Sequence, residues 1–175
     1  ITAGGVIDGS VAERTPRVIA DGRTFSYVLY ETVASEDGEA AGPRIVITQN
    51  DVRAIQLAKA ALYAGARLLM DQLGIDAVDE VRLAGAFGSQ IDPLHAMVLG
   101  LIPDCDLGRV RAAGNAAGTG ALIALLSGAA RTEIEGVVRR VEKIETAVEP
   151  RFQEHFVEAM AIPHLSLIHI SEPTR

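Results

Sequence analysis

The chain has 175 residues, which is enough for one domain and too few for two of ordinary size. Its formal net charge of -7 argues against a nucleic-acid-binding protein, and 4% aromatic residues without tryptophan argue against a stacking surface for bases or sugars. A single cysteine, Cys105, excludes an internal disulfide, a cysteine zinc site and a cysteine-ligated iron–sulfur cluster within this chain. We therefore expect a soluble, cytoplasmic domain.

Both ends of the chain predict a fragment of a longer gene. Ile1 is not an initiator methionine and no signal-peptide pattern follows it, so we expect the chain to begin within a protein. Residues 165–175 read LSLIHISEPTR, which resembles the in-frame translation of a transposase adapter used in DNA library preparation. We assign residues 1–164 to the domain and residues 165–175 to a non-native tail.

The first predicted element is a β-hairpin over residues 17–30. Asp21-Gly22 supplies the positive backbone angles that a two-residue turn requires. Alternation then places Phe25, Tyr27 and Leu29 on one face of the second strand. Residues 35–42 are polar and contain glycine, which predicts a loop.

An amphipathic helix of about twenty residues is predicted next. Thr48 and Asp51 have the spacing of a capping box, and Gly74 marks the end of the helix. The predicted buried face recurs every three or four residues and consists of Ile55, Ala58, Leu62, Ala66, Leu69 and Leu73. The predicted exposed face holds Gln56, Lys59 and Tyr63. A lysine beside a glutamine could bind a ribose or a ring nitrogen of a nucleotide, and a solvated face is the alternative.

The remaining segments complete a mixed α/β domain. Strands are predicted over 78–84 and, at an edge, over 143–147; helices are predicted over 93–99, 115–126 and 131–141 and from Pro150 onward. The run from Ala112 to Ala130 carries no charge, but its glycines and polar residues argue against a membrane span.

Two glycine-rich segments are candidates for ligand contact. Residues 85–88 follow a predicted strand, and missing side chains there would let a flat ligand approach the backbone; an ordinary strand-to-helix turn is an equal alternative. Residues 114–121 read GNAAGTGA and lack both the lysine of a phosphate loop and the third glycine of a dinucleotide fingerprint. Their small side chains favour the close approach of another helix.

Patterns for metal binding and catalysis are missing from the sequence. His95, His155 and His164 do not have the spacing of metal ligands. Asp8-Gly9 and Asp21-Gly22 lack the spacer residue of a D-x-G phosphate hairpin and predict turns. We therefore assign no catalytic residue and no metal ligand.

Three long segments together resemble the C-terminal domain of the reductive activators of corrinoid proteins. They read ITQNDVRAIQLAKAALYAG (47–65), VRLAGAFGSQIDPLHAMVLGLIP (81–103) and GNAAGTGALIALLS (114–127). These activators are ATP-dependent iron–sulfur proteins of the acetate and sugar kinase/actin-like superfamily. The resemblance implies an α/β fold that is part of a ribonuclease-H-like lobe, with the β-hairpin at its N-terminus.

The resemblance also implies roles for particular residues. The superfamily's adenosine motif, which contacts ATP with Mg²⁺, would correspond to Gly85, Ala86, Phe87 and Gly88. An inter-lobe connecting helix, where small residues let the lobes rotate, would contain Gly114, Gly118 and Gly120. A plant-type [2Fe–2S] domain elsewhere in the full protein would pass an electron to a corrinoid protein of a methyl-transfer system and return cobalt(II) to cobalt(I).

The chain differs from the whole family pattern in two respects. It contains neither the cysteine-rich cluster domain nor the D-x-G phosphate hairpins, so we expect no ATP hydrolysis and no electron transfer from this chain alone. Two alternatives stay open: a docking module for the corrinoid protein with peripheral nucleotide binding, and a lobe of a related small-molecule kinase. A Cys-x₄-Cys-x₂-Cys run upstream would favour the activator.

Deletion of residues 165–175 is expected to leave stability unchanged, because an adapter-derived tail has no evolved packing partner. Thermal unfolding of the shortened and complete chains measures the difference. A loss above about 1 kcal/mol, the size of a typical damaging substitution, would contradict the assignment.

Overall fold

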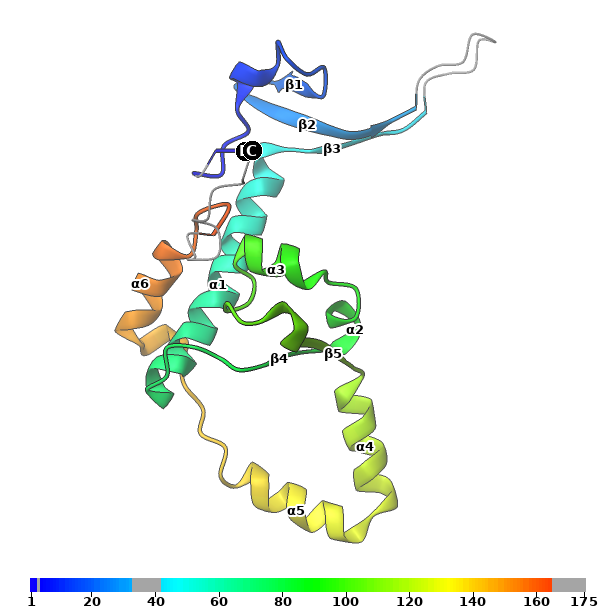
Figure 1. Cartoon of the computed structure of the whole chain (residues 1–175), viewed down its shortest axis with the longest axis vertical. Coiled ribbons are helices and arrows are strands. Elements are labelled where there is room, and N and C mark those ends of the chain that lie inside the picture. The colour runs from blue at the N-terminus through cyan, green and yellow to red at the C-terminus, as the bar shows by residue number, and fades with distance from the viewer. Residues whose placement is uncertain (3, 33–41, 165–175) are drawn as a thin grey trace.

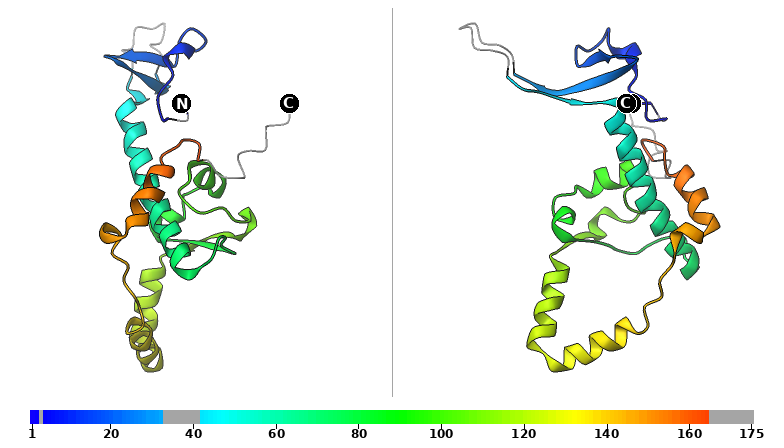
Figure 2. Two further views of the ribbon diagram at one scale, coloured as in Figure 1. Left: turned by 90° about the vertical axis from the view of Figure 1, so that its left-hand side faces the viewer. Right: turned by 180° about the vertical axis from the view of Figure 1, so that it is seen from behind.

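The fold is described from a computed structural model, which places residues 1–2, 4–32 and 42–164 and, at residue 147, the backbone only. The predicted tail and nearly all of the predicted loop of residues 35–42 lie outside the described residues. One long helix, α1 (Gln49–Leu73), forms the axis to which the other parts attach (Figure 1). Figure 2 shows the same arrangement from two further sides.

A three-stranded antiparallel sheet lies at the N-terminal end of α1. It consists of β1 (Val18–Asp21), β2 (Thr24–Glu31) and β3 (Arg44–Ile47), in that order. Asp21 pairs with Thr24 across the turn, which confirms the predicted hairpin. The third strand was not predicted. A short 3-10 helix, η1 (Gly9–Val11), precedes the sheet, and Ile7, Val18 and Val52 form the core that joins the sheet to α1.

The ends of α1 are as predicted, whereas its faces are reversed. Thr48 and Asp51 form both hydrogen bonds of the capping box, and Gly74 ends the helix with φ 65°. The stripe predicted to be buried is largely exposed, with Leu62 at 57% and Leu69 at 53%. The face that is buried consists of Val52, Gln56, Lys59, Ala60, Ala64, Leu68 and Met70.

The reversal has a physical cause in the position of α6 (Pro150–Glu158), the final predicted helix, which packs along α1. Ala60 and Ala64 are fully buried, and their small side chains let the neighbouring segments lie close to the backbone of α1. The apolar stripe of Ile55, Leu62, Leu69 and Leu73 stays largely exposed, with only Ile144 and Thr146 facing part of it across a groove. Periodicity identified the two faces but not which of them this chain would cover.

Gln56 and Lys59 were predicted to be exposed, and this prediction is wrong. Lys59 is 0% exposed, and its Nζ donates hydrogen bonds to the carbonyl oxygens of Ala159, at 2.5 Å, and Ala161. Gln56 Nε2 donates to the carbonyls of Met160, at 2.9 Å, and Gly4, at 3.2 Å. Ala159 is the C-cap of α6 and Ala161 lies beyond the helix, so the buried ammonium group of Lys59 supplies donors to carbonyls outside the helical hydrogen-bond pattern.

A small α/β unit lies on the other side of α1 (Figure 1). Its parallel strands are β4 (Val81–Ala84) and β5 (Val110–Gly114), and its helices are α2 (Gly85–Gly88), α3 (Pro93–Leu99) and the 3-10 turn η2 (Leu107–Arg109). Asp92 caps α3 as predicted. The core of this unit consists of Ala96, Met97, Ile102 and Val110.

The segment after β5 extends away from α1. It contains α4 (Ala116–Leu126), α5 (Gly128–Val138) and the 3-10 turn η3 (Thr146–Val148) (Figures 1 and 2). The predicted edge strand over 143–147 is wrong, because this segment pairs with neither sheet; Ile144 and Thr146 instead face α1 across a groove that also contains Leu62. Among the described residues, no helix is sufficiently long and apolar to span a bilayer.

Replacement of Lys59 by methionine is expected to destabilise the chain by about 2 kcal/mol at neutral pH, because two buried carbonyls lose their donor. Lys143→Met is the matched control, since the Lys143 side chain is 78% exposed and pairs only with Glu145. The control should change the free energy of unfolding by less than about 0.5 kcal/mol. Equal effects of the two substitutions in urea titrations would contradict a structural role for Lys59.

The contribution of Lys59 should also depend on pH. Burial lowers the pKa of Lys59 from 10.5 to about 8. Between these values the unfolded chain keeps a proton that the folded chain has released, so the free energy of unfolding rises with pH over this window. The wild-type protein should therefore gain stability relative to Lys59→Met between about pH 8 and about pH 10. A flat or falling difference would show that the buried amine does not titrate in this range.

Candidate functional site

The two glycine-rich segments that the sequence singled out meet at one edge of the parallel sheet. Ala84, the last residue of β4, pairs with Gly114, the last residue of β5. The next residue on one strand begins α2, and Asn115 on the other is the N-cap of α4. The carboxyl ends of parallel strands are where α/β folds bind ligands, so this edge is the candidate functional site.

The glycines of α2 differ in what the fold requires of them. Gly85 has φ +89°, a conformation that favours glycine, and open space lies where a Cβ would be. Gly88 is buried, and a Cβ there would lie 2.6 Å from the backbone of Leu83. Gly88 is therefore required for packing α2 against β4, whereas Gly85 leaves the surface of the turn accessible. Residues 85–88 form a short helix and not the predicted simple turn.

Phe87 is the most conspicuous side chain at this edge. It is 83% exposed although it is a large aromatic residue. An exposed phenylalanine beside open backbone at the end of a strand provides a flat apolar surface for a planar ligand. Ala86, next to it, is exposed as well.

Helix α4 begins at the same edge and is held there by its cap. Asn115 Oδ1 accepts a hydrogen bond of 3.0 Å from the backbone N–H of Gly118. A Cβ on Gly118 would lie 2.5 Å from the Asn115 amide, so glycine at this position makes the cap possible. Around Gly114 and Gly120 there is open space. The predicted close approach of another helix is not found within the described chain, where no residue of α4 is buried.

Gln56 and Lys59 do not belong to this edge. Their polar atoms bind the backbone carbonyls of Gly4, Ala159, Met160 and Ala161, none of which belongs to α2 or α4. This placement argues against the predicted nucleotide contact through these two residues. Periodicity alone had assigned them to a polar face, because only the position of α6 shows that this face is covered.

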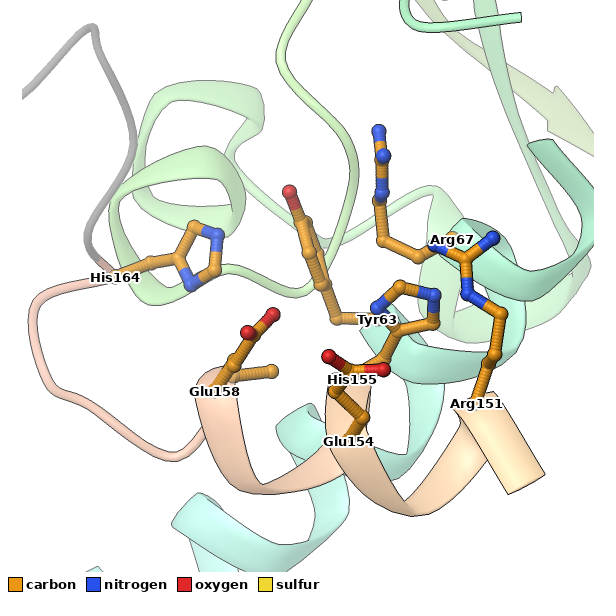
Figure 3. Close-up of a pocket in the computed structure, with 8 residues that line it drawn as sticks. Tyr63, Arg67, Arg151, Glu154, His155, Glu158 and His164 are labelled. Carbon is orange, nitrogen blue, oxygen red and sulfur yellow. The ribbon is translucent and has the colours of Figure 1, made fainter. Parts of the chain in front are cut away.

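A second feature, which the sequence did not indicate, is a cavity of about 550 Å³ between α1 and α6 (Figure 3). Residues of both helices and of the segment after α6 line it: Tyr63, Arg67, Arg151, Glu154, His155, Glu158, Ala159 and His164. Its charged residues come from parts of the sequence more than eighty positions apart, so no local pattern identifies them.

Asp71 organises one end of this cavity. Its carboxylate accepts a hydrogen bond of 2.6 Å from His155 Nε2 and forms an ion pair with Arg151 at 3.0 Å. Arg67, one turn before it on α1, lies 3.8 Å away. The hydrogen bond from His155 is the largest cause that lowers the pKa of Asp71, so this carboxylate stays ionised at neutral pH.

The other histidines have local roles. The side chain of His95 lies 3.2 Å from Asp92 at the start of α3, and the ring of His164 packs on Tyr63 with centroids 4.3 Å apart. No group of three His, Cys, Asp or Glu side chains within the described ranges is arranged to hold a metal ion.

Comparison with known proteins agrees with the resemblance that the sequence carries. Residues 1–172 match the family described as the C-terminal domain of RACo, the ASKHA domain. The corrinoid activation enzyme RamQ of Eubacterium limosum is 38% identical over 156 residues, which are 88% of this chain and 26% of that protein.

A solved structure leads to the same family. The structure of a reductive activator for corrinoid, iron-sulfur protein superposes with a TM-score of 0.77 at 31% sequence identity. The superposition covers 99% of this chain and 27% of that one, so the chain spans about a quarter of the relatives that it matches. The predicted fold class, a partial ribonuclease-H-like lobe with an N-terminal hairpin, is confirmed, and the chain belongs to the family of C-terminal ASKHA domains of reductive activators of corrinoid proteins.

Proposed function

We propose that this chain is the nucleotide-binding part of an ATP-dependent activator that returns corrinoid proteins of methyl-transfer systems to the cobalt(I) state. The observation that carries the proposal is the pairing of Ala84 with Gly114, which brings α2 and the start of α4 to one strand edge. Relatives that are activators of corrinoid proteins support the wider function. Residues 1–164 form this domain in our assignment.

In the proposed site the adenosine of ATP lies against residues 85–88. The open backbone at Gly85 lets the base approach, and the exposed ring of Phe87 supplies an apolar contact. Gly88 acts indirectly by holding α2 on β4. This chain supplies no D-x-G hairpin for the phosphates with their Mg²⁺, so those contacts would come from the rest of a longer protein.

Helix α4 is proposed to connect two lobes. Its sequence is apolar on every side, as in helices that are buried all round, yet Leu122, Leu125 and Leu126 are exposed in this chain. The relatives are about four times as long as this chain, which leaves ample sequence for a second lobe that covers α4. Gly114, Gly118 and Gly120 would then lie where the lobes move against each other.

Electron transfer would belong to another part of such a protein. Cys105, the one cysteine, cannot hold a [2Fe–2S] cluster, which takes four ligands, and burial raises the pKa of its thiol. The cluster would therefore lie in a separate domain, and this chain would couple ATP to the electron step in a cytoplasmic complex with the corrinoid protein.

Phe87→Ala is expected to weaken binding of ATP and of adenosine by about fivefold, because an exposed ring that contacts the base is lost. Stability should be unchanged, since the ring packs on little of the chain. NMR titration of the 175-residue chain measures the affinity, and the shifts should concentrate on residues 85–88. Leu73→Ala, at a residue that is 72% exposed, is the matched control.

A chimera tests the wider function. This chain would replace the corresponding C-terminal segment of RamQ, and the reduction of that enzyme's corrinoid protein would be followed by its absorbance with and without ATP. ATP-dependent reduction that Phe87→Ala slows would support the proposal. Reduction with unchanged ATP affinity in the variant would remove the adenosine assignment and favour a docking role.

A further inference from the structure

The cavity between α1 and α6 contains hydrogen-bond donors that the fold does not use. The hydroxyl of Tyr63 has no hydrogen-bond partner among the described residues, and Arg67 reaches Asp71 only at 3.8 Å, beyond hydrogen-bond distance. Burial raises the pKa of Tyr63, so its hydroxyl stays protonated and able to donate at neutral pH. Both residues are partly buried, which makes unused donors more costly than at the surface.

These donors suit a carboxylate. Tyr63 and Arg67 are four residues apart on α1, and Figure 3 shows the hydroxyl and the guanidinium group pointing in the same direction. Arg67 and Arg151 share the carboxylate of Asp71, and the carboxylate of Asp104 also acts on Tyr63. The guanidinium group of Arg67 forms no hydrogen bond with the described residues, so it is the cation available to a ligand carboxylate. A planar guanidinium group beside a hydroxyl is an ordinary binding site for carboxylate oxygens.

The other end of the cavity has the opposite charge. Glu154 and Glu158 are four residues apart on α6, and neither forms an ion pair with any residue that the structure describes. In Figure 3 the carboxylate of Glu158 lies toward His164, away from Arg67 and Arg151. Two unpaired carboxylates would repel a simple anion and attract an ammonium or guanidinium group.

We propose that this cavity binds a small zwitterion of the amino-acid class. The carboxylate of the ligand lies against Tyr63 and Arg67, and its cationic nitrogen lies against Glu154 and Glu158. The volume of about 550 Å³ is in the range of small-molecule sites. Two contacts, His155 on Asp71 and the ring of His164 on Tyr63, fix part of the wall before a ligand arrives.

The first experiment compares ligands that differ only in their charges. The 175-residue chain would be titrated by NMR with glycine, β-alanine, 4-aminobutanoate and 6-aminohexanoate, and with acetate and ethylammonium as singly charged controls. At least one zwitterion should bind saturably, with Kd between about 0.1 and 10 mM. It should bind about tenfold more tightly than either control, because it satisfies both ends of the cavity.

Substitutions then locate the site. Arg67→Gln and Glu158→Gln should each weaken the best zwitterion by about tenfold, and Tyr63→Phe, which keeps the ring on His164, by about threefold. Arg53→Gln on α1 and Glu135→Gln on α5 are matched controls outside the cavity and should have no effect. If Arg67→Gln fails to fold, Tyr63→Phe decides the carboxylate end.

Three results would overturn the proposal. They are the lack of saturable binding by every zwitterion, acetate or ethylammonium binding as tightly as the best zwitterion, and affinity that folded variants leave unchanged. Phe87→Ala should not alter zwitterion binding, because α2 lies on the other side of α1 from α6 (Figure 1). The test is therefore independent of the proposed nucleotide site.

Discussion

The structure depends on the contact between α1 and the segment that ends α6. Lys59 is fully buried and donates to two backbone carbonyls, while Asp71, three turns further along α1, holds His155 and Arg151. These polar contacts fix both ends of α6 against α1. Burying an ammonium group costs much free energy unless its N–H groups donate hydrogen bonds. The partner segment must therefore lie where its carbonyls accept them, which specifies one position for it. The α6 side of the molecule is built on this constraint.

The α/β unit on the other side of α1 is organised by strand pairing. The pairing of β4 with β5 places α2 and the N-terminus of α4 at the same edge, although about thirty residues separate them in sequence. One open backbone position, Gly85, and one exposed ring, Phe87, make this edge suitable for a planar ligand. Gly88 serves the fold, so the glycines of this segment do not share one function.

Much apolar surface remains uncovered in the chain. The outer stripe of α1 and most of α4 are exposed, and both have the composition of buried elements. In the function proposed above, a second lobe of a longer protein would pack on these surfaces, and the relatives that the chain matches are about four times as long. The same account explains how a helix without a polar face can occur in this chain.

The sequence by itself determined the local features, because they depend on neighbouring residues. The hairpin turn at Asp21-Gly22, the capping box at Thr48 and the cap at Asp92 follow from short-range backbone chemistry, and long motifs were sufficient to identify the family. Tertiary structure decided which face of α1 is covered, why Lys59 is buried, and that residues 143–147 form no strand. It also assembled the cavity around Tyr63 from segments far apart in the chain. Those features depend on which distant segment packs where, and periodicity carries no information about the partner.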